Sequence, residues 1–162
     1  MDIRHATMRD YDEMLSIYAY AREQMKRTGN PNQWGDHRPS RETIMKDIEL
    51  GQSYVVCDGS ALLGAFALTF GDEENYRVIE NGQWLNDEPY CVIHRVASAG
   101  KAKGVLSAIL AFCEGQSDNV RLDTHDDNRI MQHLLEKHGY AKCGRVYIEG
   151  GAPRIGYHKI VR

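Results

Sequence analysis

The chain has 162 residues, of which 42% are hydrophobic and 27% are charged, which is ordinary for one globular domain over residues 1–162. Its formal net charge of −3 argues against a dedicated nucleic-acid-binding protein, which would normally carry a basic face. No apolar run approaches the roughly 20 residues that a membrane-spanning helix needs, so we expect no membrane partner.

The N-terminus carries no apolar signal segment, because Met1–His5 leads at once into a pattern that predicts folded structure. The four cysteines are widely spaced and form no C-x-x-C pair. In a reducing compartment such residues are small buried apolar groups and not disulfide partners. These features favour a cytoplasmic protein.

The first half of the chain predicts two helices between an opening strand and a hairpin. Thr7-Met8-Arg9-Asp10 resembles a capping box, and behind it apolar residues recur at helical spacing to about Lys26. After a loop rich in Gly, Asn and Pro, Ser40 can cap a second helix that Gly51 stops. Asp58-Gly59 favours a tight hairpin turn between two β-rich runs. The predicted strands are 2–5, 53–57 and 61–70.

The second half of the chain alternates strands and helices and closes on two strands. Residues 71–89 are polar and irregular, and we expect a short strand near 76–79. The order of elements predicts a mixed α/β domain with a βαβα unit in this half, and an antiparallel final pair of strands around Gly150-Gly151. The other predicted strands are 90–97, 120–124, 140–148 and 154–160, and the predicted helices are 103–113 and 128–138.

The segment from His94 to Leu110 is suited to binding an anion. A buried strand ends in a turn of small residues, and a helix starts at about Lys103 with unpaired N–H groups and the positive end of its dipole. Arg95, Lys101 and Lys103 add positive charge, and no acidic residue lies in the segment. The turn matches neither G-x-x-x-x-G-K-[ST] nor G-x-G-x-x-G. The alternative is an ordinary βα loop in which the glycines serve only geometry.

Two motifs resemble those of the GNAT superfamily of acetyltransferases. Lys101-Ala102-Lys103-Gly104-Val105-Leu106 is similar to the signature Gln/Arg-x-x-Gly-x-Gly/Ala, with Lys101 and Leu106 as departures. Lysine keeps the charge but lacks the planar fork of arginine, and leucine is bulky where the family has a small residue. The family's C-terminal motif has a stronger match, in which Asn128 heads a helix that closes with Glu136-Lys137-His138-Gly139-Tyr140.

The run from Trp84 to Arg95 resembles a bacterial branch of the family, and the resemblance covers nearly the whole chain. It implies a mixed α+β GNAT fold, with a central, mostly antiparallel sheet and flanking helices. It also implies an N-acetyltransferase that uses acetyl-CoA, needs no metal, and acetylates a primary amine of a small molecule or peptide directly in a ternary complex. The residues implied to contact acetyl-CoA are Arg95, Val96 and Ala97, then Lys101, Ala102, Lys103, Gly104, Val105 and Leu106, and Asn128.

An amine must lose a proton before it attacks a thioester, since a lysine-like amine has a reference pKa of about 10.4. His94 is the first candidate for the base, because it lies in an otherwise apolar strand before the turn and imidazole titrates near neutral pH. The alternative is a core histidine with satisfied hydrogen bonds. His125, after the next strand, is the second candidate. Many family members place a tyrosine acid where this chain has Leu135.

Aromatic and acidic residues are candidates for the acceptor site. Trp34, Trp84 and Tyr90 could wall it, although such residues are otherwise core or interface. Residues 71–90 carry six acidic side chains and one basic one, which form either a solvated loop or a rim that attracts a cationic acceptor. We expect no metal site, because His133 and His138 are five residues apart and not four.

The competing hypothesis is a non-catalytic acyl-CoA-binding or regulatory module with the same fold, which Leu106 and Leu135 favour. Such a module would bind acetyl-CoA without releasing free CoA. The sequence leaves open the acceptor, the acyl-chain preference and whether two copies form a homodimer.

Overall fold

One seven-stranded sheet forms the centre of the protein, which is described over all 162 residues in a computed structural model. The strand order is β1-β2-β3-β4-β5-β7-β6, and every neighbouring pair is antiparallel except β4 and β5, which are parallel. The predicted mixed α/β class and mostly antiparallel sheet are therefore confirmed. The strands are β1 (Asp2–His5), β2 (Ser53–Asp58), β3 (Ala61–Phe70), β4 (Cys91–Ser98), β5 (Asn119–Thr124), β6 (Ala141–Tyr147) and β7 (Pro153–Ile160).

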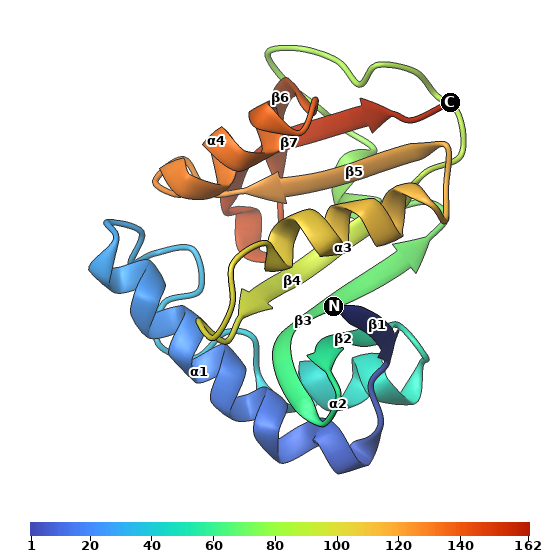
Figure 1. Cartoon of the computed structure of the whole chain (residues 1–162). Coiled ribbons are helices and arrows are strands. Elements are labelled where there is room, and N and C mark those ends of the chain that lie inside the picture. Colours follow the sequence, from blue (N-terminus) through green and yellow to red (C-terminus); the bar gives the residue numbers. More distant parts are fainter.

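Four α-helices cover the two faces of the sheet (Figure 1). Val55 and Ala65 pack in one apolar cluster with α1 and α2, whereas their neighbours Val56 and Phe66 pack in a second cluster with α3 and α4. Because successive side chains of a strand point to opposite faces, the two pairs of helices lie on opposite faces of the sheet. The helices are α1 (Tyr11–Arg27), α2 (Arg41–Glu49), α3 (Val105–Glu114) and α4 (Arg129–Lys137), with 3₁₀-helices at Met8–Asp10, Glu74–Tyr76 and Glu149–Gly151.

Local signals explain where the first two helices begin. The Asp10 carboxylate accepts a hydrogen bond from the Thr7 backbone N–H at 2.8 Å, which is half of the predicted capping box. Ser40 Oγ accepts the Thr43 N–H at 3.1 Å, so Ser40 caps α2 as predicted. The other predicted helices and strands agree with the observed ones to within about two residues, apart from one segment.

The strand predicted near 76–79 is wrong. Glu74–Tyr76 is a 3₁₀-helix, and the segment that follows makes a single isolated bridge, between Glu80 and Arg145 of β6. Tyr76 is buried, and its hydroxyl donates to the Asp123 carboxylate at 2.6 Å. The residues that suggested a strand therefore anchor a connecting segment against the sheet.

The cysteines fit the sequence interpretation, since all four are buried and unpaired. Burial raises the pKa of the Cys91 thiol to about 11, so this thiol is protonated at neutral pH. No helix of the protein combines the length and the apolar character that crossing a membrane requires.

The parallel strands β4 and β5 are paired over only a short stretch. The register joins Cys91 to Val120 and Val92 to Arg121, and no further pair follows. Both strands continue, so from Ile93 onward the edge of β4 that faces β5 has no strand partner. Figure 1 shows the two strands diverging from this point. A free strand edge offers N–H and C=O groups that an extended ligand can bind.

Candidate functional site

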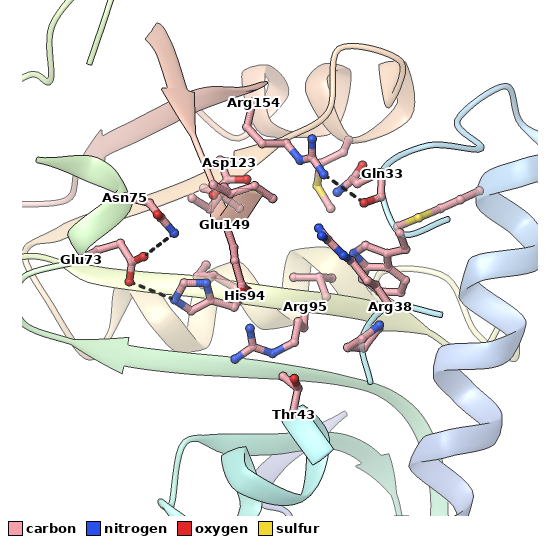
Figure 2. A pocket seen from close by; sticks show the side chains of 18 of the residues that line it. Gln33, Arg38, Thr43, Glu73, Asn75, His94, Arg95, Asp123, Glu149 and Arg154 are labelled. Atoms are coloured by element: carbon pink, nitrogen blue, oxygen red, sulfur yellow. Dashed lines mark hydrogen bonds and ion pairs between the residues drawn. The ribbon is translucent and has the colours of Figure 1, made fainter. Parts of the chain in front are cut away.

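A cavity of about 480 Å³ lies where β4 and β5 diverge (Figure 2). Proteins bind small molecules in cavities of roughly 300–1,000 Å³. Its lining comes from both diverging strands, from α1, α2 and the connection between them, from the segment after β3, from α4, and from the connection between β6 and β7 with the start of β7. The charged ones are Arg38, Glu73, Arg95, Asp123, Glu149 and Arg154.

The cavity reaches both faces of the sheet. Ile93 and Leu122 belong to the apolar cluster on the side of α3 and α4, and both line the cavity. Their neighbours His94 and Asp123 also line it, and strand alternation points these two side chains to the opposite face. The gap between the strands therefore connects the side of α3 with the side of α1 and α2.

A β-bulge sets the course of β4 beside the cavity. Ala67 pairs with His94 and Ala65 pairs with Ala97, so two residues of β4 lie opposite one residue of β3. The first of the two, Arg95, has a φ of 53°, in the left-handed region that non-glycine residues seldom adopt. Such a conformation persists only where the surrounding structure holds it.

Helices α1 and α2 hold the bulge in place. The Asp47 carboxylate of α2 accepts two hydrogen bonds from the Arg95 guanidinium, at 2.7 and 2.9 Å. The Tyr18 hydroxyl of α1 donates to the Arg95 carbonyl oxygen at 2.9 Å. Burial raises the pKa of Tyr18, so its hydroxyl stays protonated and keeps donating. The strained residue is thus fixed through both its side chain and its backbone.

Asp47→Asn should lower the free energy of unfolding by on the order of 3 kcal/mol, because it leaves the largely buried Arg95 guanidinium without its counter-charge. Asp118→Asn is a matched control, since its pair with Arg162 is exposed and such pairs contribute little. Urea unfolding of both variants and the wild type checks this. An Asp47→Asn protein that unfolds at the wild-type urea concentration would show that the pair does not hold the bulge.

His94 projects from β4 into the cavity and is about a fifth exposed, at 19%. Its Nε2 atom lies 3.1 Å from the Thr69 hydroxyl and 4.0 Å from a Glu73 carboxylate oxygen. Burial, and the charge of Arg95 beyond it, lower the pKa of His94 to about 3. The imidazole is therefore neutral at physiological pH and free to accept a proton.

Glu73 is oriented toward His94 by its own neighbours. Its backbone N–H donates to the Tyr90 hydroxyl at 2.9 Å, and Asn75 Nδ2 donates to its carboxylate at 3.1 Å. The second carboxylate oxygen is left for the imidazole (Figure 2). A carboxylate in this place stabilises the positive charge that His94 would acquire with a proton.

On the β5 and β7 side, the cavity is lined by a carboxyl group and a guanidinium group. Burial raises the pKa of the Asp123 carboxyl, which accepts the Tyr76 hydroxyl. Arg154 is 4% exposed, and its guanidinium donates to the carbonyl oxygens of Pro153 and Gln33 at 2.8 and 3.0 Å. Neither Arg154 nor Asp123 forms an ion pair with another side chain.

The turn before α3 has the properties of an anion site. The helix begins at Val105, two residues later than predicted, and its N-cap is Gly104 with a φ of 82°. No side chain caps the helix, and its first turn contains no acidic residue. Lys101 and Lys103 are exposed and form no ion pair. These free N–H groups and charges fit a phosphate group.

Leu106 and Asn128, two residues of the resemblance, have clear structural surroundings. Leu106 packs against the core cluster beneath α3, which accounts for a bulky side chain at that position. Asn128 caps α4, because its Oδ1 accepts the Met131 N–H at 3.1 Å and its Nδ2 donates to the Gln33 side chain at 2.9 Å. A contact between Asn128 and acetyl-CoA stays a prediction.

Of the three aromatic candidates, only Trp34 lines the cavity. Trp84 and Tyr90 instead enclose the guanidinium of Arg121 from β5, which lies 4.4 Å from the Trp84 ring centre and 3.9 Å from the Tyr90 ring centre. These two ring–guanidinium contacts hold the segment before β4 against the sheet. Tyr90 affects the cavity only through its hydrogen bond with Glu73.

His125, the second base candidate, lies in the turn after β5 and is not part of the cavity lining. Its Nδ1 atom accepts the Asp127 backbone N–H at 2.9 Å, which ties the turn together. The structure therefore brings His94 to the cavity and leaves His125 in a turn. The structure has no group of three or more His, Cys, Asp or Glu side chains that are placed to hold a metal ion.

The six acidic side chains between residues 71 and 90 do not form a common rim. Only Glu73 lines the cavity. Asp72 pairs with Arg77, and Glu80 accepts the Tyr147 hydroxyl at 2.8 Å. The one-sided charge of this segment is thus spread over several local contacts.

Four charged residues of the cavity were missed by sequence reasoning, whereas Glu73 was among the acidic residues considered for a rim. The four lie in separate segments, so no local motif joins them. One signal was present, since a charged residue at an inward position of a central strand is rare without a function or partner. Asp123 fits that description. The four are Arg38, Asp123, Glu149 and Arg154.

Comparison with known proteins gives matches among solved structures. No protein-family model and no curated protein matches the chain. A GNAT-family acetyltransferase from Streptococcus agalactiae is 34% identical, with a TM-score of 0.89, over 98% of this chain and 94% of that one. One from Listeria monocytogenes is 20% identical, with a TM-score of 0.72, over 98% and 93%. A Salmonella typhimurium protein solved with its cofactor acetyl-CoA is 15% identical, with a TM-score of 0.61, over 99% and 94%.

The second and third of these structures share the fold. The first goes further, because its identity extends over nearly the whole of both chains. The chain therefore belongs to the GNAT family of acetyltransferases.

Proposed function

We propose that the chain transfers the acetyl group of acetyl-CoA to a primary amine, directly and in a ternary complex, in the cavity between β4 and β5. The observation that carries this proposal is that the cavity reaches both faces of the sheet through the gap. On one face of the sheet lies α3, with the turn that would bind an anion at its start. On the other face lie His94 and Glu73. A cofactor and an acceptor can therefore meet from opposite sides.

The residues fit acetyl-CoA as the acetyl donor. Lys101–Leu106 would hold the pyrophosphate at the uncapped start of α3. The free edge of β4 from Ile93 to Ala97 would pair with the pantetheine arm, as an added strand does. Acetyl-CoA supplies a thioester whose carbonyl carbon the amine attacks. The bulge at Arg95 fixes the direction of the backbone N–H groups that face the gap, and such groups stabilise a developing oxyanion.

His94 is the proton acceptor in this proposal. The neutral amine attacks the thioester carbonyl carbon, and His94 takes up the proton that the nitrogen loses as the C–N bond forms, while Glu73 stabilises the resulting imidazolium. The C–S bond then breaks, CoA leaves as a thiolate, and the imidazolium passes the proton on to that thiolate, so that the products are the amide and free CoA. A pKa of about 3 makes the imidazole a weak base. The Glu73 carboxylate, 4.0 Å away, would lie beside the positive charge that the imidazole acquires. The proton of the attacking nitrogen is far more acidic after attack than before, which suits a weak base.

One observation supports the competing hypothesis of a non-catalytic acyl-CoA-binding module. Leu135, at the position of the family's tyrosine acid, is fully buried in the core, and no tyrosine lines the cavity. The purified chain is therefore tested for free CoA release from acetyl-CoA with polyamines, aminoglycosides, amino acids and peptides. We expect at least one amine to release CoA well above the rate without acceptor, and its trimethylated analogue to release none. Acetyl-CoA binding with no release for any amine would favour the binding module.

A further inference from the structure

The cavity contains two guanidinium groups without a carboxylate partner. Arg154 is almost fully buried, and its only hydrogen bonds are to two backbone carbonyl oxygens. Arg38, from the connection between α1 and α2, lines the same cavity. No Asp or Glu side chain forms an ion pair with either. Arg95, by contrast, is neutralised by its two-point contact with Asp47.

Two guanidinium groups in one cavity repel each other, and burying a charge without a partner is unfavourable. Burial lowers the pKa of Arg154, the charges of Asp123 and Asp126 raise it, and the charge of Arg38 lowers it. A guanidinium has five N–H donors, and the two hydrogen bonds of Arg154 leave donors unused. An anion placed between Arg38 and Arg154 would satisfy these donors and remove the repulsion.

The opposite end of the cavity suits a cation. Figure 2 shows Glu73, Asn75 and His94 on one side, Arg38 on the other and Arg154 above, with Asp123 and Glu149 between the two sides. Glu73 has no lysine or arginine partner, and the nearest basic group is the neutral imidazole of His94. The cavity therefore has two guanidinium groups at one end and a carboxylate beside a neutral imidazole at the other.

We infer that the acceptor is an amine that also carries a carboxylate group, as an amino acid does. Its carboxylate would lie between Arg38 and Arg154, which match carboxylate geometry with paired N–H donors. Its amine would lie toward Glu73 and His94, where the proposed transfer takes place. This inference rests on the proposed function and adds the chemical class of the acceptor.

The first test compares matched acceptors. Free CoA release is measured for each amino acid, its methyl ester and the amine that remains when the carboxylate is removed. We expect kcat/KM for the acid to exceed that of the other two by about 10- to 100-fold, the usual effect of a charge-assisted contact. Amines that carry a phosphate instead form a further arm. Esters or decarboxylated amines that react as fast as the acids, or faster phosphate-bearing amines, would overturn the assignment.

The second test removes one guanidinium. Arg38→Gln is chosen because Arg38 is exposed and its loss should spare the fold. The preference for acid over decarboxylated amine should fall about 10- to 100-fold, while the acetyl-CoA Kd stays unchanged. Arg9→Gln removes an exposed charge outside the cavity and should keep the wild-type preference. An unchanged preference in Arg38→Gln would contradict the inference.

Calorimetry separates failure of this inference from failure of the proposed transfer. Amino acids are titrated into the wild type and Arg38→Gln, each saturated with acetyl-CoA. Weaker binding to the variant supports the carboxylate site even if no amine releases CoA. Equal binding, or none to either protein, overturns the carboxylate site even if some other amine is acetylated.

Discussion

Gly104→Asp is expected to weaken acetyl-CoA binding by about 100-fold or more. Gly104 caps α3 in the left-handed region, where Asp and Asn are the side chains best tolerated, and a Cβ there meets no atom within 4 Å. The variant should therefore fold. Two like charges about 5 Å apart repel by about 3 kcal/mol at an effective dielectric of about 20, so a carboxylate at this turn strongly disfavours a pyrophosphate. Calorimetric titration with acetyl-CoA measures the loss.

The Gly104→Asn variant distinguishes the effect of an added negative charge on acetyl-CoA affinity from the effect of an added side chain. Asparagine has nearly the same size and the same tolerance of the left-handed region, but it adds no charge. We expect it to lose about 10-fold or less in affinity, which is well below the loss for aspartate. Equal losses in the two variants would mean that bulk and not charge matters at this turn. A folded Gly104→Asp protein with wild-type affinity would mean that the pyrophosphate binds elsewhere.

His94→Gln is expected to lower kcat/KM by about 10²- to 10⁴-fold, the usual contribution of a general base. Glutamine can keep a hydrogen bond to Thr69 but cannot carry the proton. The acetyl-CoA Kd should not change, because the turn before α3 is untouched. If His94 is only a packed core residue, the variant should melt at a lower temperature and keep its turnover per folded molecule.

The pH dependence follows from the lowered pKa of His94. Because this pKa is about 3, the histidine stays neutral above about pH 5, so kcat/KM should show no histidine step between pH 5 and 8. Stability behaves differently, since the unfolded chain binds the proton near the ordinary value of 6.5. The stability of the wild type should therefore fall as the pH drops from 6.5 toward 3, and by less in His94→Gln. Burial also lowers the pKa of His158, to about 4, but this histidine is present in both proteins, so its effect on stability cancels in the comparison.

The fold was largely predictable because its signals are local. The apolar spacing of α1, the cap at Ser40 and the turn at Asp58-Gly59 each act within a few residues. The bulge in β4 was not predictable, because Arg95 adopts a positive φ only through contacts with Asp47 and Tyr18, which are far away in sequence. The gap between β4 and β5 was not predictable either, because it depends on the residue at which the pairing of the two strands ends.

The candidate site was predictable in part. The turn that we propose binds an anion and His94 lie in one continuous segment, so the sequence could indicate both as candidates. Glu73 and Arg154 reach the cavity only through the tertiary fold, and no spacing relates them to His94. Trp84 and Tyr90 do not line this cavity, and the sequence does not reveal that Arg121 lies between their rings.

The most direct test follows the acetyl group itself. The purified chain is incubated with acetyl-CoA that carries ¹³C in its acetyl group and with the amine that releases most CoA, and the products are analysed by mass spectrometry. The account predicts that the labelled acetyl group appears on the nitrogen of the acceptor with the wild type, and not with Gly104→Asp or His94→Gln at equal times. Label that remained in acetyl-CoA with the wild type, or that accumulated on a protein side chain, would contradict it.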